Sequence, residues 1–242
     1  MKKLLKSVLY CSLLFTTIAN AQWYSKNRIK GNGKTTTEKR TTASYDEIKI
    51  AGFFDVELIS GKEGNISIQG EENLLKYIKT ETENGVLKVY TEKNASISTS
   101  KKLLITIPFE TINAVSLSGS GDLMTKTTIK STKFKTKLAG SGDVSLDIEA
   151  TDVEANLSGS GDLKIKGSTE NLVAKLAGSG DINTSALQSK NVDVTVAGSG
   201  DVSVNCTNSL KARVSGSGDI YYSGNPKTKD TKVNGSGDIT QR

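Results

Sequence analysis

The sequence predicts an all-β protein, a right-handed parallel β-helix or solenoid with coils of about 19 residues and an irregular N-terminal cap. Three observations predict this fold. The tetrapeptide G-S-G-D occurs seven times at spacings of 18 to 21 residues, and apolar residues alternate with polar ones between the copies. The composition, with 23 glycines, 2 prolines and 5% aromatic residues, is typical of short strands and tight turns. Such a short unit cannot bury its apolar face alone, so successive units must stack.

Residues 1–21 have the features of a secretory signal peptide. A basic start, an apolar run and an A-x-A cleavage site follow one another as Lys2, Lys3 and Lys6, then Leu4 to Ile18, then Ala19-Asn20-Ala21. The apolar run is too short to span a bilayer, and bulky Tyr10 before Cys11 argues against a lipoprotein anchor. We therefore expect cleavage before Gln22 and a protein exported to the periplasm, the outer surface or the medium.

Charge and residue usage exclude several functions. Removal of the signal lowers the formal net charge from +6 by three lysines to +3, and the remaining basic residues are spread along the chain, which argues against nucleic acid as the partner. The absence of histidine excludes a Ser-His-Asp triad and histidine-ligated zinc.

No later segment is apolar enough for a transmembrane helix. Cys206 is the only cysteine after cleavage and has inward parity, so we interpret it as a core residue.

Residues 22–44 form a polar lead-in with a first strand. The tripeptide Gly33-Lys34-Thr35 resembles the end of a phosphate-binding loop, but Arg28 stands where the first glycine of that motif should be, and no helical pattern follows. A simple turn is therefore the better interpretation.

Residues 45–115 predict irregular β coils that cap the N-terminal end of the stack. Ile48 to Leu58 keeps the register of the later repeats, with Phe53-Phe54 in place of Ser-Gly, and indicates a degenerate first coil. The other expected elements are a helical turn from Asn73 to Ile78, a hairpin from Thr80 to Tyr90 around Asn84-Gly85, and a strand from Leu103 to Ile107 ended by Pro108. A cap is needed because an open edge coil promotes aggregation.

Residues 116–242 carry the repeats and are expected to be continuous with residues 45–115 in one domain. If Leu138 faces inward, strict alternation places both glycines of the turn inward and the serine and aspartate outward. The repeated turn positions are Gly119 and Asp122, Gly140 and Asp143, Gly159 and Asp162, Gly178 and Asp181, Gly198 and Asp201, Gly216 and Asp219, and Gly235 and Asp238. Stacked coils would align these residues into ladders, and Tyr221-Tyr222 with Gly224-Asn225-Pro226 would interrupt the last coil.

A ladder of carboxylates spaced about 4.8 Å apart would cost about 1 kcal/mol of repulsion per neighbouring pair even in water. Two arrangements could offset it. In the first, which the sequence favours, each aspartate accepts backbone N–H bonds in its own turn or the next coil. In the second, Ca²⁺ binds at Asp143, Asp162, Asp181 and Asp201, although calcium-binding rolls repeat G-G-x-G-x-D every nine residues.

Several segments together resemble the family of the putative auto-transporter adhesin head GIN domain. The resemblance lies in Gly31-Asn32-Gly33 leading to Arg40, in Tyr45 to Leu58, in Gly70 to Leu75, in Glu83 to Val89 and in the G-S-G-D series. It covers nearly the whole mature chain and implies an exported bacterial protein with a β-helical fold. The membrane-type strands of a self-translocating autotransporter are not found in this sequence.

The function predicted is a non-catalytic adhesion or binding module of the cell surface or envelope, with a surface glycan or protein as its partner. No catalytic residue and, apart from calcium, no cofactor is predicted. Candidate contact residues are Trp23, Phe53, Phe54, Tyr221 and Tyr222. The alternatives are a structural envelope component that assembles by stacking and, on fold analogy alone, a polysaccharide-active enzyme.

Overall fold

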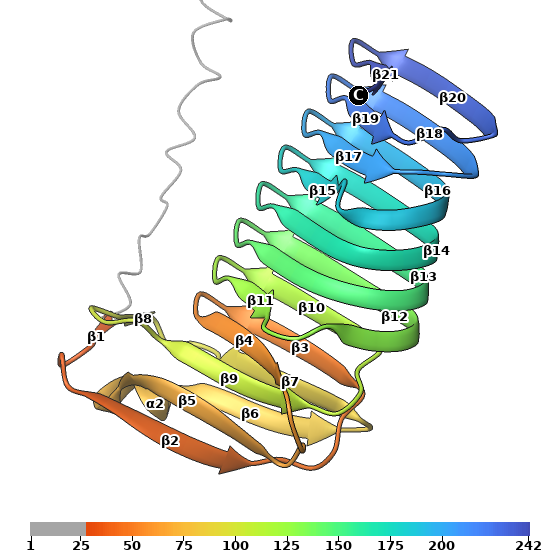
Figure 1. The fold of residues 1–242 in the computed structure, drawn as a ribbon. Helices are drawn as coiled ribbons and strands as arrows, with labels where there is room; N and C mark the ends of the chain where they lie inside the picture. The colour runs from red at the N-terminus through yellow and green to blue at the C-terminus, as the bar shows by residue number, and fades with distance from the viewer. Residues whose placement is uncertain (1–27) are drawn as a thin grey trace, which may run out of the picture.

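The computed structural model describes residues 28–242, so the predicted signal peptide, Cys11 and Trp23 lie outside the described residues. Figure 1 shows a tall stack of coils that ends at the C-terminus and rests on a group of strands near the N-terminus. Within the described residues, no helix is long and apolar enough to cross a membrane.

The repeat region forms the stack. Its strands are β10 (Ala114–Gly119), β11 (Leu123–Thr125), β12 (Ile129–Gly140), β13 (Val144–Gly159), β14 (Leu163–Gly178), β15 (Ile182–Thr184), β16 (Leu187–Gly198), β17 (Val202–Asn205), β18 (Ser209–Gly216), β19 (Ile220–Ser223), β20 (Thr228–Gly235) and β21 (Ile239–Gln241). Each coil pairs in parallel with the next, and wherever the strands that precede the turns pair, a turn glycine lies opposite a turn glycine, for example Gly119 opposite Gly140 and Gly140 opposite Gly159. The predicted stacking of the G-S-G-D turns is therefore confirmed.

Each coil has two sides, one formed by the strand before the turn and the other by the strand after it. We call these the leading face and the trailing face. Around the second repeat, Leu138, Gly142 and Val144 are buried, whereas Ala139, Ser141 and Asp143 are exposed. The inward residues of both faces pack into one continuous core that runs the length of the stack. The predicted parity through the turn is confirmed.

The degenerate first coil is also present, as β3 (Glu47–Gly52) and β4 (Asp55–Ser60). Gly52 pairs with Gly119, and Val56 pairs with Leu123, in the same register as the later coils. The phenyl ring of Phe54 is buried in the core at the place of the second turn glycine.

The chain does not run through the stack in sequence order at its N-terminal end. After β4 it leaves the stack, and it forms the terminal coil with β7 (Val86–Thr91) below β3 and β9 (Leu104–Phe109) below β4 before β10 stacks on the opposite edge of β3. Figure 1 shows β9 and β7 between the stack and the lower strands. The neighbour of the first coil on that side is therefore a later segment of the chain.

Antiparallel strands complete the cap. β6 (Ile78–Glu83) pairs with β7, β5 (Asn65–Glu71) pairs with β9, and β2 (Thr35–Thr41) pairs with β5. A short helix, α2 (Glu72–Leu75), follows β5, and β1 (Ile29–Lys30) pairs with β8 (Ile97–Ser98). The antiparallel strands β2, β5 and β6 cover the edge that the stack would otherwise expose, as a solenoid requires.

The cap matches most of its predicted elements. The β6–β7 hairpin turns at Asn84 and Gly85, whose φ angles are 51° and 73°, and α2 lies at the predicted helical turn. The expectation that Pro108 ends its strand is wrong, because β9 continues to Phe109. Proline fits there because β5 pairs with β9 only up to Thr106, so no ladder bond is lost on that side.

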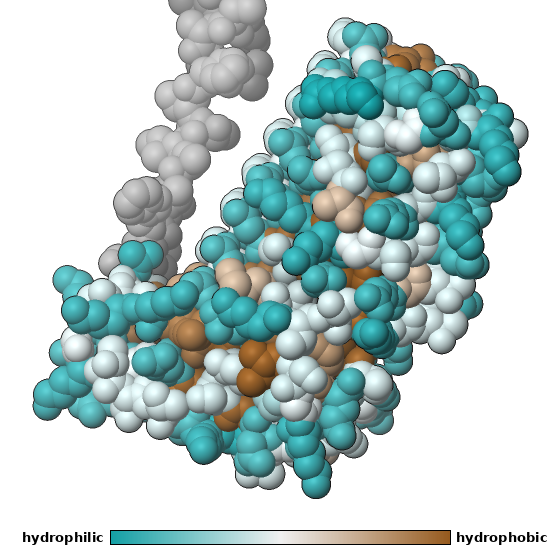
Figure 2. Space-filling model, in the orientation of Figure 1, coloured by the Kyte–Doolittle hydropathy of each residue, from teal (hydrophilic) through white to brown (hydrophobic). Residues whose placement is uncertain are grey.

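The C-terminal coil keeps its register, so the expected interruption by Tyr221-Tyr222 and Gly224-Asn225-Pro226 is wrong. Val214 pairs with Val233, and Pro226 is buried in the bend. The inward positions change character in this coil, however, because Lys229 pairs with Leu210 and Thr231 pairs with Ala212. The Lys229 ammonium lies 5.3 Å from the centre of the Tyr222 ring. Figure 2 shows a mostly hydrophilic end of the stack with one small hydrophobic spot. Polar groups thus replace part of the apolar core at this end, while Val233 and Ile239 continue it.

Candidate binding surface

The G-S-G-D turns are shaped by close contact between successive coils. The first glycine of each turn has a φ between 135° and 146°, a region that side chains with a Cβ rarely adopt. The second glycine has no such φ, but a Cβ on Gly161 would lie 1.9 Å from the carbonyl oxygen of Gly142. Both glycines are therefore required by the packing of coil on coil.

The aspartates of the turns form a hydrogen-bonded ladder along the outside of the stack. The N–H of each one donates to the Oδ1 of the aspartate one coil earlier, at 3.1 Å for Asp143 to Asp122 and 2.8 Å for Asp201 to Asp181. The ladder begins at Asp55 of the first coil, which accepts from Asp122. Near its other end, the N–H of Asp238 and then the hydroxyl of Tyr221 hold the pKa of Asp219 below its ordinary value. These bonds are the backbone arrangement that the sequence favours.

The same ladder is a weak arrangement for calcium. Ca²⁺ takes six to eight oxygen ligands, and several must converge on one point. Each coil contributes one turn aspartate, and in Asp143, Asp162, Asp181 and Asp201 one oxygen already accepts a backbone N–H. No group of three or more acidic, cysteine or histidine side chains converges within the part of the chain that the structure describes. The donor set does not fit a calcium site.

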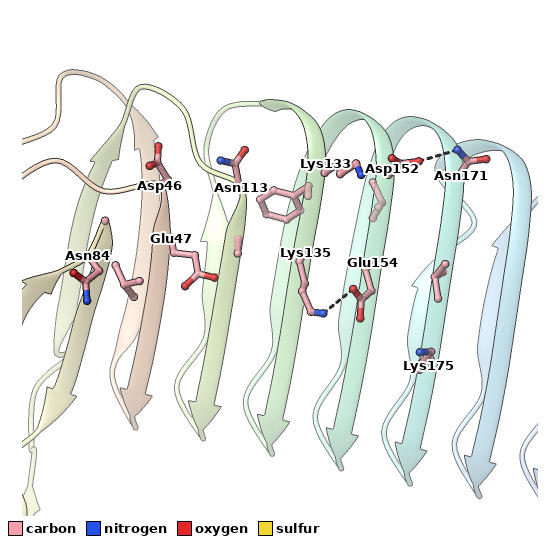
Figure 3. A pocket seen from close by; sticks show the side chains of 16 residues that line it. Asp46, Glu47, Asn84, Asn113, Lys133, Lys135, Asp152, Glu154, Asn171 and Lys175 are labelled. Atoms are coloured by element: carbon pink, nitrogen blue, oxygen red, sulfur yellow. Dashed lines mark hydrogen bonds and ion pairs between the residues drawn. The ribbon is translucent and has the colours of Figure 1, made fainter.

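The leading face carries an open groove of about 880 Å³ that crosses β7, β3, β10, β12, β13 and β14. Figure 3 shows its side chains on neighbouring strands, with Lys135 and Glu154 in the middle. Lys135 Nζ and Glu154 Oε2 are 2.7 Å apart, and bonds from Lys135 and Asn156 lower the pKa of Glu154. Half-buried Val86 and Val173 add apolar surface to the same column of residues. The groove thus offers paired charges and apolar contacts over several coils.

An amide ladder borders this groove at the bend. Asn171 Nδ2 donates to Asp152 at 2.8 Å, Asn191 Nδ2 donates to Asn171 at 2.9 Å, and Asn208 Nδ2 donates to Asn191 at 2.8 Å. Figure 3 shows the first of these bonds. These side-chain bonds hold successive coils together at this bend, which is away from the glycine turns.

Basic residues form a second column on the leading face, three positions before the turn glycine. In this cation column, every second strand carries a basic residue, namely Lys49, Lys137, Lys175 and Arg213. The strands between them carry a polar uncharged residue at the same position, namely Ser116, Asn156 and Thr195. Lys88 and Lys232 extend the column at its two ends. Small exposed residues such as Ala139, Ser158 and Ala177 lie between this column and the turns.

Other predicted residues are placed as follows. Phe54 and Tyr222 are buried core residues, so they are not contact residues, and Phe53 is half-buried against the core. Tyr221 remains partly exposed, with the Arg242 guanidinium 3.3 Å from the centre of its ring. Cys206 is fully buried, and this burial raises the pKa of its thiol. Its predicted place in the core is confirmed.

A buried carboxylate ties the lead-in to the cap. Glu71 is enclosed and accepts bonds from the N–H groups of Gly33, Ser100 and Lys101 and from the Ser100 hydroxyl. These bonds, those of Ser100 first, lower its pKa to about 2. A Cβ on Gly31 would lie 2.0 Å from the Glu71 carboxylate, so the Gly31-Asn32-Gly33 segment is a tight structural turn.

These features define a β-solenoid whose surface chemistry is repeated in ladders along its axis. The chain belongs to the family described as putative auto-transporter adhesin, head GIN domain, whose sequence model matches residues 44–226. No curated protein matches the chain.

Solved structures share the fold. A putative adhesin from Bacteroides fragilis NCTC 9343 is 23% identical, with a TM-score of 0.82 over 88% of this chain and 100% of its own. A putative lipid binding protein from Parabacteroides distasonis ATCC 8503 is 28% identical, with a TM-score of 0.76 over 89% of this chain and 99% of its own. A putative adhesin from the same organism is 24% identical, with a TM-score of 0.74 over 89% and 100%.

Sequence reasoning missed the groove, the amide ladder and the cation column. The cation column carries a readable signal, because Lys137, Lys175 and Arg213 all lie three residues before a turn glycine. The groove carries none, since Asn84 and Val86 reach it only through the pairing of β7 with β3.

Proposed function

We propose that this protein is an exported binding module that acts as an adhesin at the bacterial cell surface or in the envelope, and that it binds through its leading face. The observation that carries the proposal is the continuity of this face. Parallel strands from β7 to β20 present aligned columns of charged, amide and small side chains, and the groove of about 880 Å³ crosses six of these strands. Membership of an adhesin family supports the same role.

A non-catalytic role agrees with how the acidic residues are distributed. The turn aspartates recur at equivalent places, one per coil. Of the four acidic residues in the groove, Glu47 and Glu154 are each paired with a lysine and Asp152 accepts a hydrogen bond from Asn171. Catalysis by carboxylates needs a distinct pair in a cleft, with one member kept protonated. Binding uses repeated equivalent groups, and a repeated surface suits a repetitive partner.

The lipid-binding description of one structural neighbour suggests a second ligand class. The interior of the solenoid is filled by packed apolar side chains from Ile48 to Val214, so a lipid tail would have to lie on the outside. Polar Lys229 and Thr231 at the C-terminal end likewise disfavour assembly by stacking of apolar ends.

The test is a binding screen of the mature chain against envelope glycans, surface proteins and lipid vesicles. A groove variant, Val86→Glu with Val173→Glu, is compared with a trailing-face variant of the same added charge, Ser145→Glu with Ser203→Glu. We expect a ligand whose binding is lost in the groove variant and kept in the trailing-face variant. Equal binding by both variants, or no ligand in any class, would contradict the proposal.

A further inference from the structure

The cation column has a two-coil period. Over the strands from β3 to β18, a cation on one strand is followed by a serine, asparagine or threonine on the next. Adjacent strands are about 4.8 Å apart, so successive cations are about 9.6 Å apart along the axis. This distance is close to the length of one disaccharide in an extended polysaccharide chain.

Two of these cations, Lys137 and Lys175, form no ion pair in the described part of the chain, and Lys175 acts on Glu154 only through its charge. The acidic residues beside the column are already paired, with Glu154 on Lys135 and Asp193 on Lys211, each at 2.7 Å. Arg213 is paired with Asp230 and Lys49 with Glu47. Within residues 28–242, Lys137 and Lys175 are exposed and make neither an ion pair nor a hydrogen bond.

The surroundings of Lys137 and Lys175 leave room for a chain along the axis. Between the column and the turns, the outward residues of β12, β13 and β14 are Ala139, Ser158 and Ala177, all exposed and small. The side chains of Lys137 and Lys175 therefore lie beside a strip of small residues, Ala139, Ser158 and Ala177, that runs along the axis. This strip carries no acidic side chain on β12, β13 and β14. Asn156, between the two lysines, offers an amide to a neutral sugar hydroxyl.

We propose that this strip binds a linear acidic polysaccharide that carries one carboxylate on every second sugar, with Lys137 and Lys175 contacting successive carboxylates. The inference rests on the proposed function and names its ligand class. Nucleic acid fits less well, because its phosphates are more closely spaced and the strip between β10 and β18 has no aromatic side chain on which a base could stack.

The test uses hyaluronan, which has one carboxylate per disaccharide, and the mature chain. Dextran serves as the neutral polymer and single-stranded DNA as a second polyanion. In the test variant, Lys137→Ser and Lys175→Ser introduce the residue that the column already has at Ser116. The matched control, Lys62→Ser with Lys164→Ser, removes the same charge from exposed lysines that lie outside the leading face.

We expect hyaluronan to bind and dextran not to bind. The test variant should weaken hyaluronan binding by at least about tenfold, because two charge-assisted contacts are lost. The control should change it by less than about twofold, and added salt should weaken the wild type more than the test variant. Unchanged affinity in the test variant, or tighter binding of DNA than of hyaluronan, overturns the inference.

The two proposals fail in different ways. If the wild type binds a neutral glycan or a surface protein through the groove but not hyaluronan, the acidic-polysaccharide inference is wrong and the binding module stands. If it binds nothing in the wider screen, both are wrong.

Discussion

The N–H of Asp219 donates a hydrogen bond of 2.8 Å to Oδ1 of Asp201 in the preceding coil. Asp201 in turn donates its own N–H to Asp181 at the same distance. Each carboxylate therefore accepts from the coil that follows it, and this bond offsets the repulsion between neighbouring charges. The turn aspartates act as connectors between coils.

Two substitutions at Asp201 distinguish the effect of its hydrogen-bond acceptor from the effect of its negative charge. Asp201→Asn keeps a side-chain oxygen for the Asp219 N–H and removes one charge from the row, so we expect stability within about 0.5 kcal/mol of the wild type. Asp201→Ala removes the acceptor and should cost about 1 kcal/mol. Urea unfolding measures both, and equal loss in the two variants would show that the charge is what matters.

Gly161 tests the contact between coils. Gly161→Ala would place a Cβ 1.9 Å from the Gly142 carbonyl oxygen, and a backbone group cannot move aside as a side chain can. We expect a loss of about 3 kcal/mol in the free energy of unfolding. The neighbouring Ser160 is exposed, so Ser160→Ala is the control and should stay within about 0.5 kcal/mol. A tolerated alanine at position 161 would contradict the stacking of the turns.

Glu71 should make stability depend on pH in the acid range. In the unfolded chain this carboxyl protonates near its ordinary pKa of 4.5, whereas the folded protein keeps it charged down to about 2. The unfolded state therefore binds more protons in this window, and the stability from Glu71, fully present above pH 4.5, is lost as the pH falls toward 2.

The comparison is with Glu71→Gln, which cannot titrate. The difference in unfolding free energy between wild type and variant should shrink as the pH is lowered from 5 to 3, and other carboxylates cancel because both proteins carry them. A constant difference over this range would mean that the Glu71 cage does not favour the charged form.

Thr136 is a buried hydroxyl at a core position, and within the described residues it has no hydrogen-bond partner. Its neighbours in the same column are Val115 and Ala155. Thr136→Val has the same shape without the unpaired polar group, so we expect a gain of about 1 kcal/mol in urea unfolding. Thr136→Ala, which leaves a small void, should give a smaller gain or a loss.

Lys229 and Thr231 should keep the C-terminal end from associating. Lys229→Leu with Thr231→Val would continue the apolar columns of Leu210 and Ala212 to an open end. We expect concentration-dependent oligomers by analytical ultracentrifugation, because an exposed apolar edge coil promotes pairing. Lys232→Leu with Thr240→Val makes similar changes on the outer sides of the same coil. Equal oligomerisation in this control would assign the effect to hydrophobicity alone.

The sequence by itself determined the repeat region and its first coil. A fixed repeat length with alternating apolar residues leaves one way to bury the core, so Gly140 must lie over Gly119 and Asp143 must point outward. The same parity placed Cys206 in the core and identified β3 and β4 as a coil although Phe54 replaces a glycine.

Only the tertiary structure decided the cap and the leading face. The placement of β7 and β9 below β3 and β4 joins segments that no repeat relates, and its energy comes from long-range pairing and burial rather than from local pattern. The groove follows from that placement, since it needs Val86 beside Glu47. The register of the coils also decides which lysines lie close enough to a carboxylate to form an ion pair. Within the part of the chain that the structure describes, Lys137 and Lys175 do not, and this could not be read from the sequence.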